Sequence, residues 1–106
     1  MKIVAVTACP TGIAHTYMAA ARLEKIAKDL GHEIKVETQG ALGIENALSE
    51  NDIRQAQAVI LAIDINVEGR NRFRGMKVIE VPLQEAIKNT KEVFEKLQPG
   101  SELPGS

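Results

Sequence analysis

The sequence contains very few aromatic side chains and a single cysteine. Aromatic residues make up 3% of its 106 residues and tryptophan is absent, so no platform for stacking nucleic-acid bases is visible. One thiol cannot form an internal disulfide, which fits a reducing cytoplasm. The formal net charge is −1, whereas a dedicated nucleic-acid binder is usually basic. We therefore expect a cytoplasmic protein with no nucleic-acid partner.

Long apolar runs are also missing. No stretch has the length of a transmembrane helix, and Met1-Lys2 leads directly into a strand, so we expect neither a membrane span nor a signal peptide. The two histidines and the cysteine do not have the spacing of metal ligands, and we expect no metal and no cofactor. Residues 1–98 are expected to form one domain, and residues 99–106 a flexible tail, either a linker or a non-native remnant.

Four segments have the pattern of strands and alternate with helical patterns. The expected strands are 2–7, 33–38, 58–63 and 78–81, and the expected helices cover 14–30, 49–57 and the residues from 82 onwards. Continuous apolar character places the first and third strands at the centre of a parallel sheet, and strict alternation places the second at an edge. We therefore predict a three-layer α/β fold, with a four-stranded, mainly parallel sheet of order 2-1-3-4. This is the flavodoxin-like, or Rossmann-like, arrangement without a fifth strand.

The helical segments show apolar stripes and terminal signals. In the first helix the stripe consists of Ala19, Leu23, Ile26, Ala27 and Leu30. Gly31 is a suitable stop, and Ser49 with Asp52 resembles a capping box for the second helix. The segment from Ile44 to Leu48 is interpreted as a helical turn, and residues 64–77 as a long polar loop.

The turn between the first strand and the first helix carries the only thiol, Cys9. A helix that begins there presents unpaired backbone N–H groups and the positive end of its dipole, which together favour an anion. The same groups stabilise a thiolate, so a nucleophile and an oxyanion cradle coincide. An arbitrary cysteine in a small domain is more often an inert packing residue. The position at the end of a strand favours the functional interpretation.

The turn that follows Cys9 supplies the candidate phosphate-binding residues. They are Pro10, Thr11, Gly12, Ile13, Ala14, His15 and Thr16. Pro10 stiffens the turn, and Gly12 permits close approach of the backbone. Thr16 serves as a hydroxyl donor or as a helix cap, and His15 donates a hydrogen bond to a bound phosphoryl group or is an exposed first-turn residue; the sequence leaves both choices open.

Ligands of such sheets bind at the carboxyl ends of the central strands, where the strand order reverses. The loops that leave the second and third strands at this edge therefore supply candidate residues that would surround the phosphate-binding turn. They are Gln39, Gly40, Asp64 and Asn66.

The run C-P-T-G-I-A-H-T-Y-M-A-A, from Cys9 onwards, closely resembles the phosphorylation-site signature of fructose-type enzyme IIB domains of the bacterial sugar phosphotransferase system. The resemblance continues through V-E-T-Q-G at residues 36–40 and through the A-I-D-I-N-V and R-F stretches. It extends over nearly the whole chain, to about Leu97.

This resemblance implies a phosphocarrier, which is a phosphotransferase. Cys9 would accept a phosphoryl group from a phosphohistidine of the IIA domain. It would then pass the group to a sugar, expected to be fructose, that the membrane-embedded IIC domain holds during uptake. A fused IIC domain could also tether the protein to the inner membrane.

Two other classes of protein place similar residues in this kind of fold. A phosphatase resembling the low-molecular-weight tyrosine phosphatases also carries a cysteine after the first strand, but its loop closes with arginine six residues later, where this chain has His15. A nucleotide- or flavin-binding module would have no use for the thiol. The basic loop Arg70-Asn71-Arg72-Phe73-Arg74 could steer an acidic or phosphorylated partner, or could simply be solvated.

Overall fold

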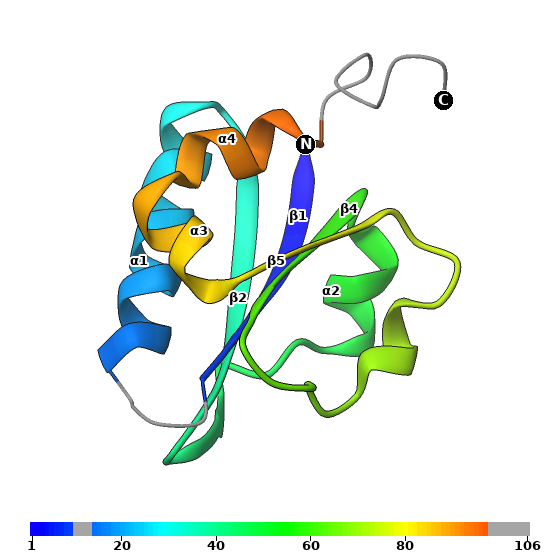
Figure 1. Cartoon of the computed structure of the whole chain (residues 1–106). Helices are drawn as coiled ribbons and strands as arrows, with labels where there is room; N and C mark the ends of the chain where they lie inside the picture. Colours follow the sequence, from blue (N-terminus) through cyan, green and yellow to red (C-terminus); the bar gives the residue numbers. More distant parts are fainter. Residues whose placement is uncertain (10–13, 98–106) are drawn as a thin grey trace, which may run out of the picture.

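The computed structural model of the chain describes residues 1–9 and 14–97. A twisted sheet forms the middle layer (Figure 1). Helices α1 (Ala14–Asp29), α3 (Leu83–Lys88) and α4 (Thr90–Glu95) cover one face, and α2 (Glu50–Gln55) covers the other together with the short 3₁₀ helix η1 (Arg70–Phe73). The expected tail, residues 99–106, lies outside the described residues. The predicted three-layer α/β fold is confirmed.

The sheet has the order β3-β2-β1-β4-β5. Its strands are β1 (Lys2–Ala8), β2 (Glu33–Gly40), β3 (Gly43–Glu45), β4 (Ala58–Ile63) and β5 (Val78–Val81). The pairs β1–β2, β1–β4 and β4–β5 are parallel, so the predicted order of the four long strands is confirmed. Because β1 lies between two parallel partners, its carboxyl end, and therefore Cys9, is placed at the switch point of the sheet.

The strand β3 was not predicted and corrects two expectations. It pairs antiparallel with the end of β2, with Gly40 opposite Gly43, so the sheet has five strands and β2 is not an edge strand at its carboxyl end. Residues from Ile44 onwards do not form the expected helical turn. Gly43 has a φ of 95°, which a glycine adopts without strain and which lets the chain reverse here.

Helix α1 is held against the sheet by small and branched side chains. Its buried residues include Ala19, Leu23 and Ala27, which confirms most of the predicted stripe, but Leu30 lies beyond the helix and remains 37% exposed. Gly31 follows with a φ of 81° and provides the predicted stop. Ala19, Leu23 and Ala27 belong to an apolar cluster on the α1 face of the sheet, which also includes Cys9 and Phe94.

The remaining helices are short, and their ends have identifiable causes. Ser49 accepts from the backbone N–H of Asp52, whose carboxylate accepts from the Ser49 N–H, so the predicted capping box is confirmed. The single last helix was a wrong prediction. The backbone leaves the helical conformation at Asn89 (φ −126°, ψ 45°), and the hydroxyl of Thr90 donates to the carbonyl of Ala86 at 2.5 Å, a competing local bond that separates α3 from α4.

We expect Leu23→Ala to lower the free energy of unfolding by about 2–5 kcal/mol, because a fully buried side chain on α1 would leave a cavity. Leu30→Ala is the matched control, since Leu30 is already 37% exposed and its loss should cost well under ~1 kcal/mol. Urea unfolding of both variants measures the difference. Equal costs at the two positions would contradict this account of the α1 packing.

Candidate functional site

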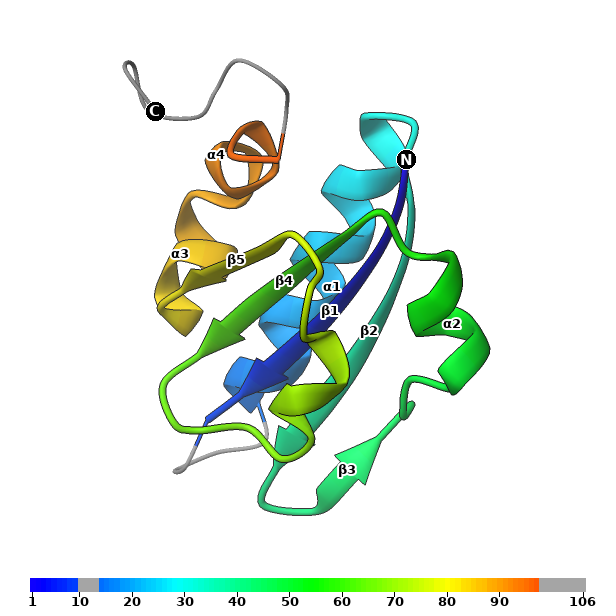
Figure 2. The same ribbon diagram turned by 90° about the vertical axis from the view of Figure 1, so that its right-hand side faces the viewer.

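Cys9 follows the last residue of β1 and is 5% exposed. Its side chain belongs to the apolar cluster on the α1 face, and it also lines a pocket of about 410 Å³. Cys9 is therefore nearly buried and at the same time borders a cavity. Figure 2 shows the end of β1, the β2–β3 hairpin and the segment after β4 at the same end of the sheet.

The start of α1 supplies the described part of the predicted phosphate-binding turn. Ala14 and His15 are the first residues of the helix, and His15 is exposed. Thr16 is 1% exposed, and its carbonyl accepts a hydrogen bond from the hydroxyl of Thr7 at 3.1 Å. This bond joins β1 to the first turn of α1. Residues 10–13, which include Pro10, Thr11, Gly12 and Ile13, lie outside the described residues.

Three of the four residues predicted to surround the phosphate-binding turn line the same pocket as Cys9. They are Gln39, Gly40 and Asn66, which lie beside Ile44, Ile65 and Glu68. Asp64 does not line it: one of its carboxylate oxygens accepts from the backbone N–H of Leu83 at 3.2 Å. Asp64 thus serves the start of α3, where a carboxylate interacts favourably with the helix dipole.

Glu37 is the most deeply buried charged residue in the described part of the chain, at 1% exposure. The strict alternation of polar and apolar residues in β2 is typical of a strand with one solvated face, but at Glu37 the polar face is buried. Arg72 on η1 donates to both carboxylate oxygens, at 2.9 and 3.0 Å. The backbone N–H of Leu48 donates to Oε1 at 2.9 Å, and Gln39 Nε2 donates to Oε2 at 2.8 Å. The contacts of Glu37 thus connect β2 with η1 and with the segment that precedes α2.

These contacts also determine the ionisation of Glu37. Burial by itself raises the pKa of a carboxyl group, but the hydrogen bonds from Arg72, Leu48 and Gln39, together with the charge of Arg72, outweigh it and leave the pKa of Glu37 below its ordinary value. The sequence contained one usable signal, since Glu37 and Gln39 lie two residues apart on one strand and therefore share a face. Nothing in the sequence identified Arg72 as the partner.

The basic loop is engaged within the molecule. Arg72 is bound to Glu37 and packs over the ring of Phe73, 4.9 Å from its centroid. Arg70 forms an ion pair with Glu80 of β5. The side chains of Val67 and Phe73 are buried, so residues 64–77 are not the purely polar loop that was expected. Two of its arginines hold this segment against the sheet, which leaves them less available for steering a partner.

Exposed apolar side chains lie around the Cys9 pocket. Ile44 and Ile65 line it and are 45% and 39% exposed, and Leu42, at the turn between β2 and β3, is 66% exposed. Tyr17 on α1 donates a hydrogen bond to the carboxylate of Glu45 on β3. This bond raises the pKa of the tyrosine hydroxyl. It also connects α1 with the β2–β3 hairpin. We call Leu42, Ile44 and Ile65 the apolar rim.

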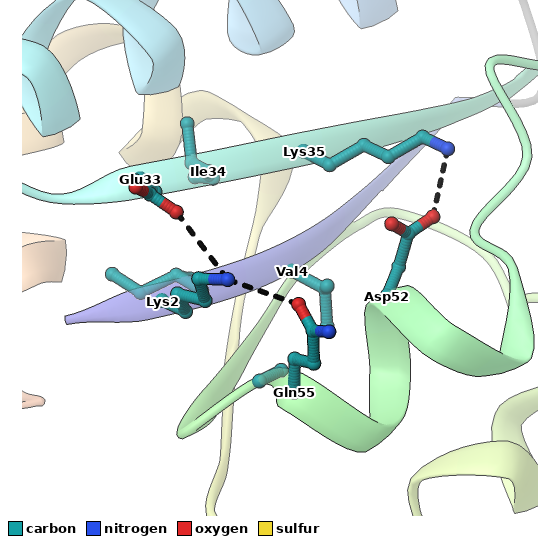
Figure 3. A pocket seen from close by; sticks show the side chains of 9 residues that line it. Lys2, Val4, Glu33, Ile34, Lys35, Asp52 and Gln55 are labelled. Carbon is teal, nitrogen blue, oxygen red and sulfur yellow. Dashed lines mark hydrogen bonds and ion pairs between the residues drawn. The ribbon is translucent and has the colours of Figure 1, made fainter.

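A second hollow, of about 150 Å³, lies between α2 and the starts of β1 and β2 (Figure 3). Its polar side chains are bound to one another: Lys2 contacts Gln55 at 2.9 Å and Glu33 at 3.7 Å, and Lys35 contacts Asp52 at 2.8 Å. The hydrogen bonds from Lys35 and Ser49 lower the pKa of Asp52 to about 2. The Lys2–Gln55 and Lys35–Asp52 pairs attach α2 to the sheet.

The described residues offer no evident metal centre and no membrane span. Within residues 1–9 and 14–97, no three side chains of the metal-binding types His, Cys, Asp and Glu are grouped to hold an ion. In the same part of the chain, no helix combines the length and apolar character needed to cross a bilayer.

The fold and the pocket define an α/β domain with a cysteine at the carboxyl end of its central strand. The family model described as "PTS system, Lactose/Cellobiose specific IIB subunit" matches residues 4–96. The chain belongs to this family, the IIB subunits of the sugar phosphotransferase system.

The relatives in this family bear fructose-related names. "PTS system fructose-like EIIB component 2" of Escherichia coli (strain K12) is 47% identical over 97 residues, which are 92% of each chain. "PTS system fructose-specific EIIABC component" of Bacillus subtilis (strain 168) is 53% identical over 95 residues. This match covers 90% of the present chain but 15% of that relative. The predicted resemblance to fructose-type IIB domains is confirmed.

Solved structures show the same fold at comparable identity. A domain of the fructose-specific IIABC component from Borrelia burgdorferi superposes with a TM-score of 0.85 at 51% identity, over 89% of each chain. The enzyme IIB subunit of the PTS system from Escherichia coli K12 gives a TM-score of 0.82 at 45% identity, over 91% of this chain and 93% of that one.

We expect Glu37→Gln to lower the free energy of unfolding at pH 7 by about 3 kcal/mol, because it leaves the Arg72 charge without its carboxylate. The pKa of Glu37 is lowered on folding, so its stabilisation is fully present above the ordinary pKa of 4.5 and is lost as the pH falls through the lower, folded value. The difference in the free energy of unfolding between wild type and variant should therefore become smaller as the pH is lowered. Urea unfolding at pH 7, 4.5 and 3 checks this, and a difference of constant size would contradict it.

Proposed function

We propose that this protein is a phosphocarrier in which the Sγ atom of Cys9 takes a phosphoryl group from a phosphohistidine of IIA and passes it to a sugar held by IIC. The observation that carries the proposal is the position of Cys9, at the switch point of the sheet and in the wall of a pocket. Membership of the IIB family supports it. The names of the relatives favour fructose as the sugar.

The chemistry consists of two displacements at phosphorus. In the first, the thiolate of Cys9 attacks the phosphoryl group, the S–P bond forms and the N–P bond of the phosphohistidine breaks. In the second, the oxygen of a sugar hydroxyl attacks and gives up its proton, the O–P bond forms, and the S–P bond breaks as the thiolate leaves. A thiolate suits both steps, since it is a good nucleophile and a good leaving group. Low exposure of the sulfur limits access of water, which would otherwise hydrolyse the intermediate.

The start of α1 supplies the electrostatic half of the proposed site. Helix α1 begins at Ala14, and its start lies at the same end of the sheet as the end of β1 (Figure 1). The unpaired N–H groups of a first helical turn favour a phosphoryl group. We assign this binding role to the turn from Pro10 to Thr16, with its backbone N–H groups as donors except at Pro10, which has none.

The partners follow from the same proposal. One relative is named an EIIBC component and another an EIIABC component, and this chain spans 22% and 15% of their lengths, respectively. We infer that IIA docks at the Cys9 pocket on the cytoplasmic side and that the sugar held by IIC receives the phosphoryl group there. The apolar rim around the pocket offers IIA a surface to bury.

We expect incubation with phosphorylated IIA to add one phosphoryl group to the wild-type protein and none to Cys9→Ser, as measured by intact mass. Cys9 is the only cysteine, so the comparison is unambiguous. His32→Asn is the control and should be labelled like the wild type. Label that persists on Cys9→Ser, or that vanishes from His32→Asn, would place the phosphoryl group elsewhere. Rapid release of inorganic phosphate from a chromogenic phosphate ester would instead favour the hydrolase.

We expect Leu42→Asp to raise the KM for phosphorylated IIA roughly ten-fold with little change in kcat, because a charge replaces an apolar contact at the edge of the pocket. Leu30→Asp is the matched control: Leu42 lies between Ala41 and Gly43, which line the pocket, whereas Leu30 is also exposed, at 37%, but follows the far end of α1. Steady-state transfer kinetics measure both variants. A wild-type KM for Leu42→Asp, or an equal rise for Leu30→Asp, would rule out docking at the rim.

A further inference from the structure

The side chain of Gln39 binds the backbone of the segment that follows β4. Its Oε1 accepts from the N–H of Glu68 at 2.9 Å, and its Nε2 donates to the carbonyl of the same residue at 3.1 Å. The amide thus pairs with Glu68 as a neighbouring strand would. Gln39 and Glu68 line the Cys9 pocket together with Ile65 and Asn66. The Gln39–Glu68 pair therefore holds one wall of that pocket.

Glu37 determines which way the Gln39 amide faces. An ionised carboxylate can only accept hydrogen bonds, so the NH₂ group of Gln39 must face Glu37 Oε2, at 2.8 Å. This leaves the amide oxygen facing the N–H of Glu68. If the amide were reversed, its oxygen would meet the Glu37 carboxylate and both bonds to Glu68 would be lost. The pairing with Glu68 depends on the charge of a residue that does not line the pocket.

Arg72 balances the charge of Glu37 and also binds the backbone of the segment that follows β4. It donates to both oxygens of Glu37, and it also donates to the carbonyls of Gly69 and Glu68, at 2.7 and 3.2 Å. The carbonyl of Glu68 therefore accepts from Gln39 and from Arg72. A bidentate guanidinium fixes direction as well as distance. The hydrogen bonds among Glu37, Gln39 and Arg72 therefore restrict movement of the pocket wall at Glu68.

From this geometry we propose that Glu37 is a positioning residue for the reaction at Cys9: by orienting the Gln39 amide it holds the 65–68 segment as a fixed wall of the thiol pocket. The inference rests on the proposed function. A fixed wall matters because displacing groups around a reacting centre by about 1 Å can slow a reaction by up to ~100-fold. Glu37 acts through Gln39, and neither needs to touch the phosphoryl group.

The test compares Glu37→Gln, Gln39→Leu and the double variant. In each we expect loss of hydrogen-exchange protection at the Glu68 amide, faster alkylation of Cys9 by iodoacetamide, and a kcat for transfer from phosphorylated IIA that is lower by ~10-fold, with KM nearly unchanged. The double variant should be no slower than either single one, because both changes remove the same pairing. Gln39→Leu keeps the Glu37–Arg72 ion pair, so it remains informative if Glu37→Gln folds poorly.

Asp52→Asn is the control for general destabilisation, since it breaks an ion pair at α2, away from the Cys9 pocket. It should lower the unfolding midpoint without changing alkylation or transfer. Wild-type kcat in Glu37→Gln, or kcat losses that multiply in the double variant, would overturn the inference. If the wild type takes up no phosphoryl group, the proposed function fails, and the alkylation rates still decide the positioning role: equal rates in all variants would refute it.

Discussion

A carboxylate as buried as that of Glu37 is tolerated only when its oxygens are fully hydrogen-bonded and its charge is matched. Here both conditions are met by groups from different parts of the chain: Arg72 from η1, the N–H of Leu48 after β3, and Gln39 from β2 itself. No one of these segments could stay in place without the others, because each would leave a polar group unpaired in the interior. The loops at the carboxyl edge of the sheet are therefore fixed together.

The sheet explains why this network lies beside the thiol. In the register of β1 and β2, Val6 is opposite Glu37 and Ala8 is opposite Gln39, so the polar residues of β2 lie next to the last residues of the strand that leads into Cys9. Val6 and Ala8 pack in the cluster on the α2 face, whereas Cys9 packs in the cluster on the α1 face. The thiol is thus held by the apolar core from one side, and one wall of its pocket is held by the polar network on the other.

Much of this arrangement could be predicted because it depends on local signals. Continuous apolar character identifies β1 and β4 as central strands, the Ser49–Asp52 pair specifies a helix start, and the Cys9 motif identifies the family. The missed features depend on distant contacts. Alternation places Glu37 on one face of β2 but cannot tell what covers that face, and Arg72, which does so, lies in another loop. Strand β3 has three exposed residues, so it carries no hydrophobic pattern to detect.

In the proposed function the site must satisfy two opposing demands. A phosphoryl group on sulfur has to be kept from water, yet two different partners must reach it in turn. A mobile lid would meet the first demand at the expense of the second. The present pocket has a rigid polar wall and an exposed apolar rim, and such a rim becomes dry only when a partner covers it. Under this arrangement the partner itself completes the water-excluding enclosure, so that the reactive centre is sealed while transfer occurs and is accessible again when the partner leaves.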